Sequence, residues 1–238
     1  MPVRIVHWAF FVLLAFQIVT GYIGGEIMEW HEYSGYCMLA LVIFRVFWGF
    51  AGSTHARFAS FIAGPVAAYR FARRLFSNQA VPQVGHNPLG GWMIVALLVD
   101  LALQVATGLF ANDGISTEGP LAPMVAVEVS HRLSQFHRWN VHLLVVLSVL
   151  HVAAALFHWL VKKEDLIGAM FTGVKHVPPA LLRERRTGPR ATPPRRVASR
   201  ESPQSAEFPS GWRAAALMAL AVAIVLAIVR AAGWAGYQ

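Results

Sequence analysis

Five stretches of this chain are apolar for about 20 residues each, which is the length that an α-helix needs to cross a lipid bilayer. These stretches are residues 7–25, 33–51, 90–110, 138–160 and 212–234. Hydrophobic residues make up 56% of the sequence and charged residues 13%, roughly half the charged share of an ordinary soluble domain. The sequence therefore predicts an all-α integral membrane protein. The first stretch is preceded by a basic residue but is followed by no small-residue cleavage site, so we expect a retained helix and not a cleaved signal.

The basic residues of the connecting segments predict an orientation, because cytoplasmic loops are enriched in Lys and Arg. The turn at residues 24–32 has no Lys or Arg, and residues 111–136 carry three acidic residues against Arg132. Basic residues lie instead between the second and third stretches and after the fourth. We therefore expect a cytoplasmic N-terminus and, after five spans, an external C-terminus. The net charge of +8 fits this topology, so we expect membrane lipid and no nucleic acid as a partner.

Two further segments complete the predicted organisation. Residues 66–76 are weakly amphipathic and are expected to lie along the inner membrane interface. Residues 177–211 are rich in Pro, Arg and Ser with little to bury, which predicts a disordered cytoplasmic linker. The stretch after this linker contains no histidine, so we interpret residues 212–238 as a transmembrane helix that serves as an anchor or a partner contact.

Histidines are the unusual feature of the fourth apolar stretch. The segment 135–159 holds four of them, His137, His142, His151 and His158. A polar group without a hydrogen-bonding partner in hydrocarbon costs roughly 2–7 kcal/mol. We therefore expect some of these rings to be bonded to a partner or a cofactor.

Helix geometry predicts two histidine pairs at two depths of the membrane. His137 and His151 are fourteen residues apart, a rotation about 40° short of whole turns and a rise of about 21 Å, so both rings face the same way. His31 lies near the outer end of the second stretch and can meet His137. His7 lies near the inner end of the first stretch and can meet a deeper histidine, but helix geometry alone does not decide between His151 and His158.

Paired imidazoles without other ligands favour haem over a zinc site. A flat porphyrin between helices takes one imidazole on each face, whereas zinc usually needs four ligands, often with Cys or carboxylate. The single cysteine, Cys37, lies inside an apolar stretch, which excludes a C-x-x-C-H haem attachment motif. The sequence thus predicts non-covalent haem b, with one haem for each histidine pair.

With these residues in place, the chain resembles the bacterial cytochrome b561 family, which includes the b-type cytochrome subunits of nickel-iron hydrogenases. The resemblance covers about residues 3–176 and rests on an ordered set of short motifs. In chain order these are "RIVHW", "HEYSG", "FRVFWGFAGSTHARF", "GHNPLGGWM", "FHRWN" to "LHVAAALFH", and "AMFTGVK".

The resemblance implies a four-helix di-haem domain over residues 1–176, in the bacterial inner membrane. It implies His7 with His151 as ligands of the inner haem and His31 with His137 as ligands of the outer haem. It thereby favours His151 over His158. Arg138 departs from the family, whose members often have Glu after the outer histidine.

Three more residues are candidates for binding a cofactor. Arg45 lies about 21 Å deeper than His31, where an arginine is costly without a partner, and a haem propionate would pair with it. Snorkelling to the cytoplasmic interface is the alternative. His86 and Asn87 precede Pro88 at the inner mouth of the third stretch, where they would hold a propionate or a quinone carbonyl, or simply cap the helix.

These features predict an electron conduit across the membrane. Electrons would pass between a periplasmic partner, such as a c-type cytochrome or a hydrogenase-like oxidoreductase subunit, and a quinone such as ubiquinone or menaquinone. The acidic residues of the first outer turn suit docking of a basic cytochrome: they are Glu26, Glu29 and Glu32. The alternatives are a stand-alone quinone reductase that oxidises a small reductant such as superoxide, and an anchor or transporter with structural histidines. A homodimer is compatible with the sequence.

Overall fold

The computed structural model describes residues 2–75, 88–115, 117–173 and 211–235. Five of its helices are long and apolar enough to span a membrane, which confirms the predicted fold class. They are α1 (Pro2–Ile23), α2 (Met28–Ala51), α5 (Pro88–Gly108), α6 (Val127–Leu160) and α9 (Gly211–Ala235). Shorter elements connect them: η1 (Gly25–Ile27), η2 (Thr54–Ala56), α3 (Phe58–Phe61), α4 (Pro65–Leu75), η3 (Ala122–Met124) and α7 (Leu166–Thr172).

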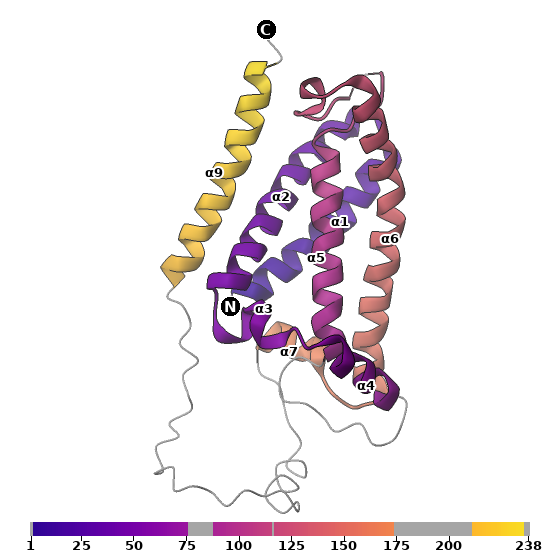
Figure 1. Cartoon of the computed structure of the whole chain (residues 1–238), viewed down its shortest axis with the longest axis vertical. Helices are drawn as coiled ribbons and strands as arrows, with labels where there is room; N and C mark the ends of the chain where they lie inside the picture. Colours follow the sequence, from indigo (N-terminus) through magenta and orange to yellow (C-terminus); the bar gives the residue numbers. More distant parts are fainter. Residues whose placement is uncertain (1, 76–87, 116, 174–210, 236–238) are drawn as a thin grey trace, which may run out of the picture.

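Four helices form the bundle, α1, α2, α5 and α6 (Figure 1), and each packs on the next one along the chain. α1 packs on α2, α2 on α5, and α5 on α6. A cluster of buried apolar side chains from α2, α5 and α6 fills the middle of the bundle. It consists of Met38, Val42, Leu98, Leu101 and Leu144.

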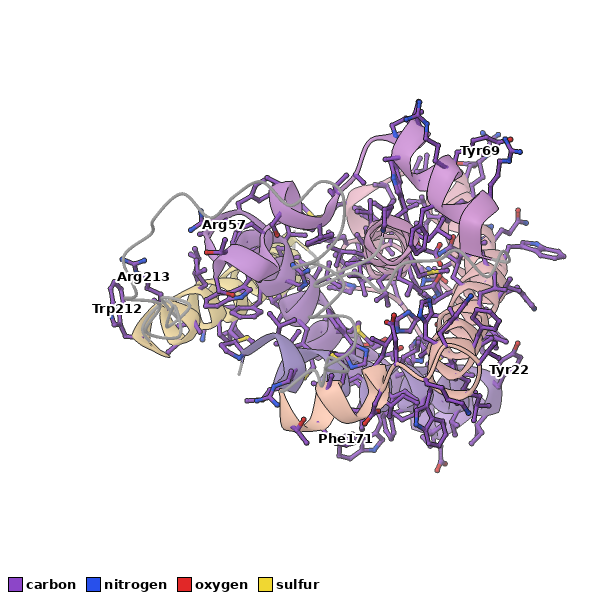
Figure 2. The ribbon with its side chains drawn as sticks, turned by 90° about the horizontal axis from the view of Figure 1, so that it is seen from below. Tyr22, Arg57, Tyr69, Phe171, Trp212 and Arg213 are labelled. Carbon is purple, nitrogen blue, oxygen red and sulfur yellow. The ribbon has the colours of Figure 1, made fainter. Side chains whose placement is uncertain are left out.

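The fifth long helix, α9, lies outside this bundle against α2 (Figure 1). Its Ala221 is fully buried against Phe44 and Trp48 of α2, and Val225 packs on Leu39. Figure 2 looks along the bundle from the end that carries α4 and α7, and it shows α9 at the edge, with Trp212 beside its first turn. The predicted helix at residues 212–234 is therefore present, and it covers one face of α2.

The beginning of α6 differs from the sequence prediction. The apolar stretch was predicted to begin at residue 138, but the helix begins at Val127 and runs for 34 residues. Its first three turns contain too many polar residues to appear as part of an apolar run in the sequence. They are anchored instead by hydrogen bonds to the preceding turn, where Ser130 Oγ donates to Phe110 O and Ser134 Oγ accepts from Asn112 N. The long loop predicted at residues 111–136 is thus about half helical.

The two ends of the bundle carry different short elements (Figure 1). The start of α1 lies at the end that holds α3, α4 and α7, and Arg4 Nη1 donates to Phe171 O there at 2.8 Å. The predicted amphipathic segment 66–76 is found as α4 (Pro65–Leu75). η1 and η3 lie at the opposite end. The predicted linker 177–211 lies almost entirely outside the described residues.

Candidate functional site

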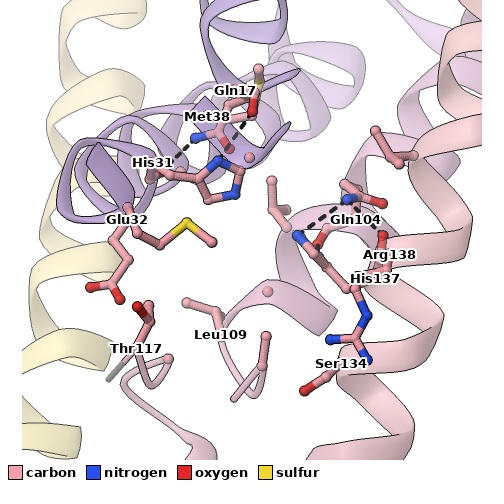
Figure 3. A pocket seen from close by; sticks show the side chains of 18 of the residues that line it. Gln17, His31, Glu32, Met38, Gln104, Leu109, Thr117, Ser134, His137 and Arg138 are labelled. Atoms are coloured by element: carbon pink, nitrogen blue, oxygen red, sulfur yellow. Dashed lines mark hydrogen bonds between the residues drawn. The ribbon is translucent and has the colours of Figure 1, made fainter. Parts of the chain in front are cut away.

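The outer histidine pair faces a cavity of about 510 Å³ between α1, α2, α5 and α6. His31 lies one turn into α2, and His137 lies in the third turn of α6. Their ring centres are 6.2 Å apart, with ring planes at 84°. Figure 3 shows the two imidazoles pointing toward each other across this cavity.

Hydrogen bonds fix the tautomer of His31. Its Nδ1 lies 3.1 Å from the backbone oxygen of Gln17, which can only accept. Nδ1 also lies 3.1 Å from Thr20 Oγ1, whose own hydrogen is donated to Phe16 O at 2.8 Å. Both neighbours therefore accept, so Nδ1 carries the proton and Nε2 keeps its lone pair.

His137 is held in the same tautomer. Its Nδ1 donates to Gln104 O at 2.9 Å and lies 3.3 Å from Thr107 Oγ1, which itself donates to Leu103 O. The amide Nε2 of Gln104 lies 3.3 Å from His137 Nε2, a long contact that is consistent with a lone pair on that ring nitrogen. Second-shell bonds of this type orient histidines that bind metals.

The inner histidine pair consists of His7 and His151. Their ring centres are 6.1 Å apart, with ring planes at 59°. Within the described residues, the buried Nδ1 of His7 has no hydrogen-bond partner. His158, which helix geometry left open as a partner for His7, has its Nδ1 3.7 Å from a carboxylate oxygen of Glu164 instead.

The spacing within both pairs fits a haem. Two imidazoles that bind one metal ion from opposite sides, with bonds of about 2 Å, have ring centres about 6 Å apart. The observed 6.1 and 6.2 Å match this value. No cluster of three or more His, Cys, Asp or Glu side chains able to hold a metal ion is found in the described part of the chain, so a zinc-type donor set is not available there.

Two glycines make room for the outer imidazoles. A Cβ at Gly21 would lie 3.1 Å from Cε1 of His31, and a Cβ at Gly108 would lie 2.9 Å from Cε1 of His137. Both distances are shorter than the roughly 3.5–4.0 Å of favourable carbon contacts. A side chain at either position would displace the ring that faces the cavity.

Arg45 is buried in the inner half of α2, with 8% of its surface exposed. Its guanidinium lies 5.3 Å from the ring centre of Phe58, and its Nη1 has no hydrogen-bond partner in the described residues. Its side chain is therefore shielded from solvent beside α3, at the end of the bundle expected to be cytoplasmic. A buried cation with an open donor fits a carboxylate such as a haem propionate. His86 and Asn87 lie outside the described residues.

The three glutamates of the outer turn do not all face outward. Glu26 and Glu29 are exposed, and Glu29 accepts a hydrogen bond from Tyr33 at 2.8 Å. Glu32 is half-buried and lines the cavity, as does Arg138 (Figure 3). We call the two exposed glutamates, Glu26 and Glu29, the acidic face.

Sequence reasoning missed the residues that hold the outer histidines in place. An internal repeat could have identified these residues. The segments "QIVTG" at residues 17–21 and "QVATG" at residues 104–108 both have the pattern Gln-x-x-Thr-Gly. Each copy lies on the helix that precedes a helix bearing an outer histidine. Gln17, Thr20, Gln104 and Thr107 all contact those histidines.

A membrane-spanning helical bundle with facing pairs of imidazoles, each at the separation that one iron requires, defines the class of membrane b-type cytochromes. The chain belongs to the family described as prokaryotic cytochrome b561, whose model matches residues 1–173. It is thus a multi-pass bacterial membrane protein for electron transfer, and haem b is the cofactor that the family implies.

Curated relatives of the chain carry names that agree with this family. A probable Ni/Fe-hydrogenase B-type cytochrome subunit of Azotobacter chroococcum is 28% identical, over 72% of this chain and 85% of that protein. Proteins of the same name from Bradyrhizobium diazoefficiens and Azotobacter vinelandii are 25% and 26% identical, over 72% of this chain and 82% and 85% of those proteins. No solved structure matches the chain.

Proposed function

We propose that this chain is a di-haem conduit that moves electrons across the membrane. His7 and His151 would bind the inner haem b, and His31 and His137 the outer haem b. The observation that carries the proposal is the pair of imidazole separations, 6.1 and 6.2 Å. The two ligands on α6 are fourteen residues apart, which separates the two sites by about 21 Å along the helix.

The protein contributes ligands, burial and fixed polar groups, while the haem supplies reversible one-electron chemistry when bound. Apolar side chains of the central cluster exclude water between the two sites. Arg45 would neutralise a propionate of the inner haem. We place the proposed quinone, ubiquinone or menaquinone, at this inner end, where the sequence alone predicts His86 and Asn87 as binding residues.

The external partner is proposed to be a periplasmic oxidoreductase subunit, hydrogenase-like, or a c-type cytochrome. The names of the curated relatives support an oxidoreductase partner. The acidic face favours a partner with a basic docking surface, because complementary charges on two proteins speed their association.

The proposed topology places the N-terminus in the cytoplasm. Exposed arginines and lysines gather at the bundle end that holds the start of α1, whereas the acidic face lies at the other end. This distribution supports the positive-inside orientation. We further propose that residues 1–176 form the haem domain, that 177–211 form a linker, and that 212–238 form an accessory transmembrane segment.

A stand-alone quinone reductase that oxidises superoxide is the second candidate. It needs a small-molecule opening beside the outer haem. The cavity between His31 and His137 is the space that the porphyrin itself would occupy, so this cavity gives that candidate no separate support. The conduit accounts for both histidine pairs and is therefore preferred.

Haem stoichiometry tests the proposal. Pyridine haemochrome analysis of the purified protein should give two b haems per chain, and His7→Ala and His31→Ala should each give one. His131→Ala is the matched control, because this exposed histidine in the second turn of α6 does not line the cavity and its loss should leave two haems. A reproducible value of one haem in the unmodified protein would sink the di-haem scheme.

A further inference from the structure

The repeated Gln-x-x-Thr-Gly sequence builds two matching collars around the outer histidines. We define the first collar as Gln17, Thr20 and Gly21 of α1, and the second as Gln104, Thr107 and Gly108 of α5. The first collar surrounds His31 on α2, and the second surrounds His137 on α6. The helix pairs α1–α2 and α5–α6 therefore present their outer ligands in the same way.

In each collar, the oxygen of the threonine hydroxyl accepts a hydrogen bond from the histidine. Thr20 Oγ1 donates to Phe16 O at 2.8 Å, and Thr107 Oγ1 donates to Leu103 O at 2.7 Å. Each hydroxyl has a single hydrogen, so its contact with the neighbouring Nδ1 uses an oxygen lone pair. Each Nδ1–H thus meets two acceptors, a helix carbonyl and a threonine oxygen.

The glutamines tie the histidine backbones to the collars. Gln17 Nε2 donates to His31 O at 2.7 Å and to Ser34 Oγ at 2.8 Å. Gln104 Nε2 donates to His137 O at 3.1 Å, and its Oε1 accepts from Asn140 at 2.9 Å. Ser34 and Asn140 each lie three residues after the histidine of their helix, so the two networks match position by position.

The inner pair lacks such collars in the described part of the chain. The buried Nδ1 of His7 has no hydrogen-bond partner there. No hydrogen bond joins the ring of His151 to a described residue either. The two sites have the same ligand type and almost the same ring separation, but their second shells differ.

This difference has an electronic consequence. An acceptor on the distal N–H of an imidazole ligand raises the basicity of that ligand. A more basic ligand stabilises the oxidised iron over the reduced iron, and hydrogen bonding around the ligands is one of the means by which proteins set haem potentials. Two acceptors on each outer imidazole should therefore lower the potential of the outer site.

On the basis of the proposed di-haem function, we propose that Thr20 and Thr107 are positioning residues. They hold the outer ligands as Nδ1–H tautomers and thereby give the outer haem a lower midpoint potential than the inner haem. His31 and His137 would then hold the electron donor and His7 and His151 the electron acceptor, so that one iron would lose one electron as the other gains it. The external partner reduces the outer site, and the quinone is the final oxidant, taking two electrons and two protons.

Potentiometric titration of the haem absorption bands tests this assignment. Thr20→Val and Thr107→Val keep the side-chain shape but remove the acceptor oxygen. Each should shift one of the two midpoint potentials upward, and that component should be the lower one in the unmodified protein. The double variant should shift it further, because the two threonines act on different ligands. Thr→Ser at either position keeps the oxygen and should restore the original potential.

Thr172→Val is the matched control, because Thr172 Oγ1 makes the same kind of helix bond, to Gly168 O at 2.9 Å, in α7. It should move neither potential. If valine in place of Thr20 or Thr107 prevents binding of the outer haem, the same potentiometric titration is made with the alanine variant, which also lacks the acceptor oxygen. The proposal is overturned if neither component moves, if the movement is downward, or if the component that moves is the higher one. A single haem in the unmodified protein would instead refute the proposed function, so the two failures are distinguishable.

Discussion

Gly108 is the position at which one added methyl group would perturb the outer site most directly. In Gly108→Ala the new Cβ would lie 2.9 Å from Cε1 of His137, so the imidazole must retreat by about 0.6 Å or more to reach a favourable carbon contact. Overpacking of this kind costs about 1–3 kcal/mol. If the whole of this cost opposes haem binding, the affinity of the outer site for haem decreases by roughly 5-fold to 150-fold.

The fold itself should not suffer from this substitution. Gly108 is the last residue of α5, so alanine there keeps the helical backbone, and the gain from helix propensity is smaller than the roughly 1 kcal/mol found inside a helix. Gly108→Ala should therefore separate haem affinity from helix stability. Gly21→Ala should act in the same direction but less strongly, because its Cβ would lie 3.1 Å from the ring of His31.

Haem titration into detergent-solubilised apoprotein, followed at the Soret band, measures the two affinities, and circular dichroism measures the fold. Gly233→Ala is the matched control, because a Cβ at Gly233 in α9 meets nothing within 4 Å. The expected order of outer-site weakening is Gly108→Ala, then Gly21→Ala, then no change in Gly233→Ala. If Gly108→Ala binds haem as tightly as Gly233→Ala does, the imidazole of His137 is not held by this contact and the reasoning fails.

Three further comparisons of variants test the remaining parts of the site. His151→Ala should lose the inner haem and His158→Ala should keep both, as counted by pyridine haemochrome, because the ring of His158 lies beside Glu164; haem loss in the second variant alone would reverse the assignment. Arg45→Gln should weaken inner haem binding by removing a buried cation, while Arg213→Gln, at an exposed position, should not; equal haem retention by the two variants would argue against a propionate at Arg45. Replacing the acidic face by glutamine should keep both haems but slow electron exchange with a basic soluble cytochrome at low salt in stopped-flow measurements, and unchanged salt curves would exclude that surface as the docking site.

Periodicity and hydropathy were sufficient to predict most of the fold. Apolar runs of about 20 residues identify transmembrane helices because the bilayer fixes their length, and all five predicted spans correspond to helices. The start of α6 was missed for the same reason. Its first turns carry Glu128 and Arg132, and they are held by serine hydrogen bonds to the preceding turn, which no hydropathy window detects.

The histidine spacing predicted which rings come together, because 14 residues return a helix almost to the same face. It left His151 and His158 equivalent. The family resemblance favoured His151, and the side-chain geometry brings the ring of His151 beside His7 and the ring of His158 beside Glu164. The collars depend on contacts between neighbouring helices, which periodicity within one helix cannot predict. A search for internal repeats would have found Gln-x-x-Thr-Gly, but its meaning depends on the histidine that faces it.

The length and continuity of α6 bear on how this protein responds to its membrane. Both His137 and His151 belong to one unbroken helix, whereas their partners come from α1 and α2. Bilayers of different thickness are accommodated mainly by helix tilt, and tilting a rigid rod changes its angle but not the distance between two points on it. The spacing of the two redox centres should therefore be insensitive to lipid chain length, so a thicker or thinner membrane would alter access to the ends of the bundle before it altered the internal electron-transfer step.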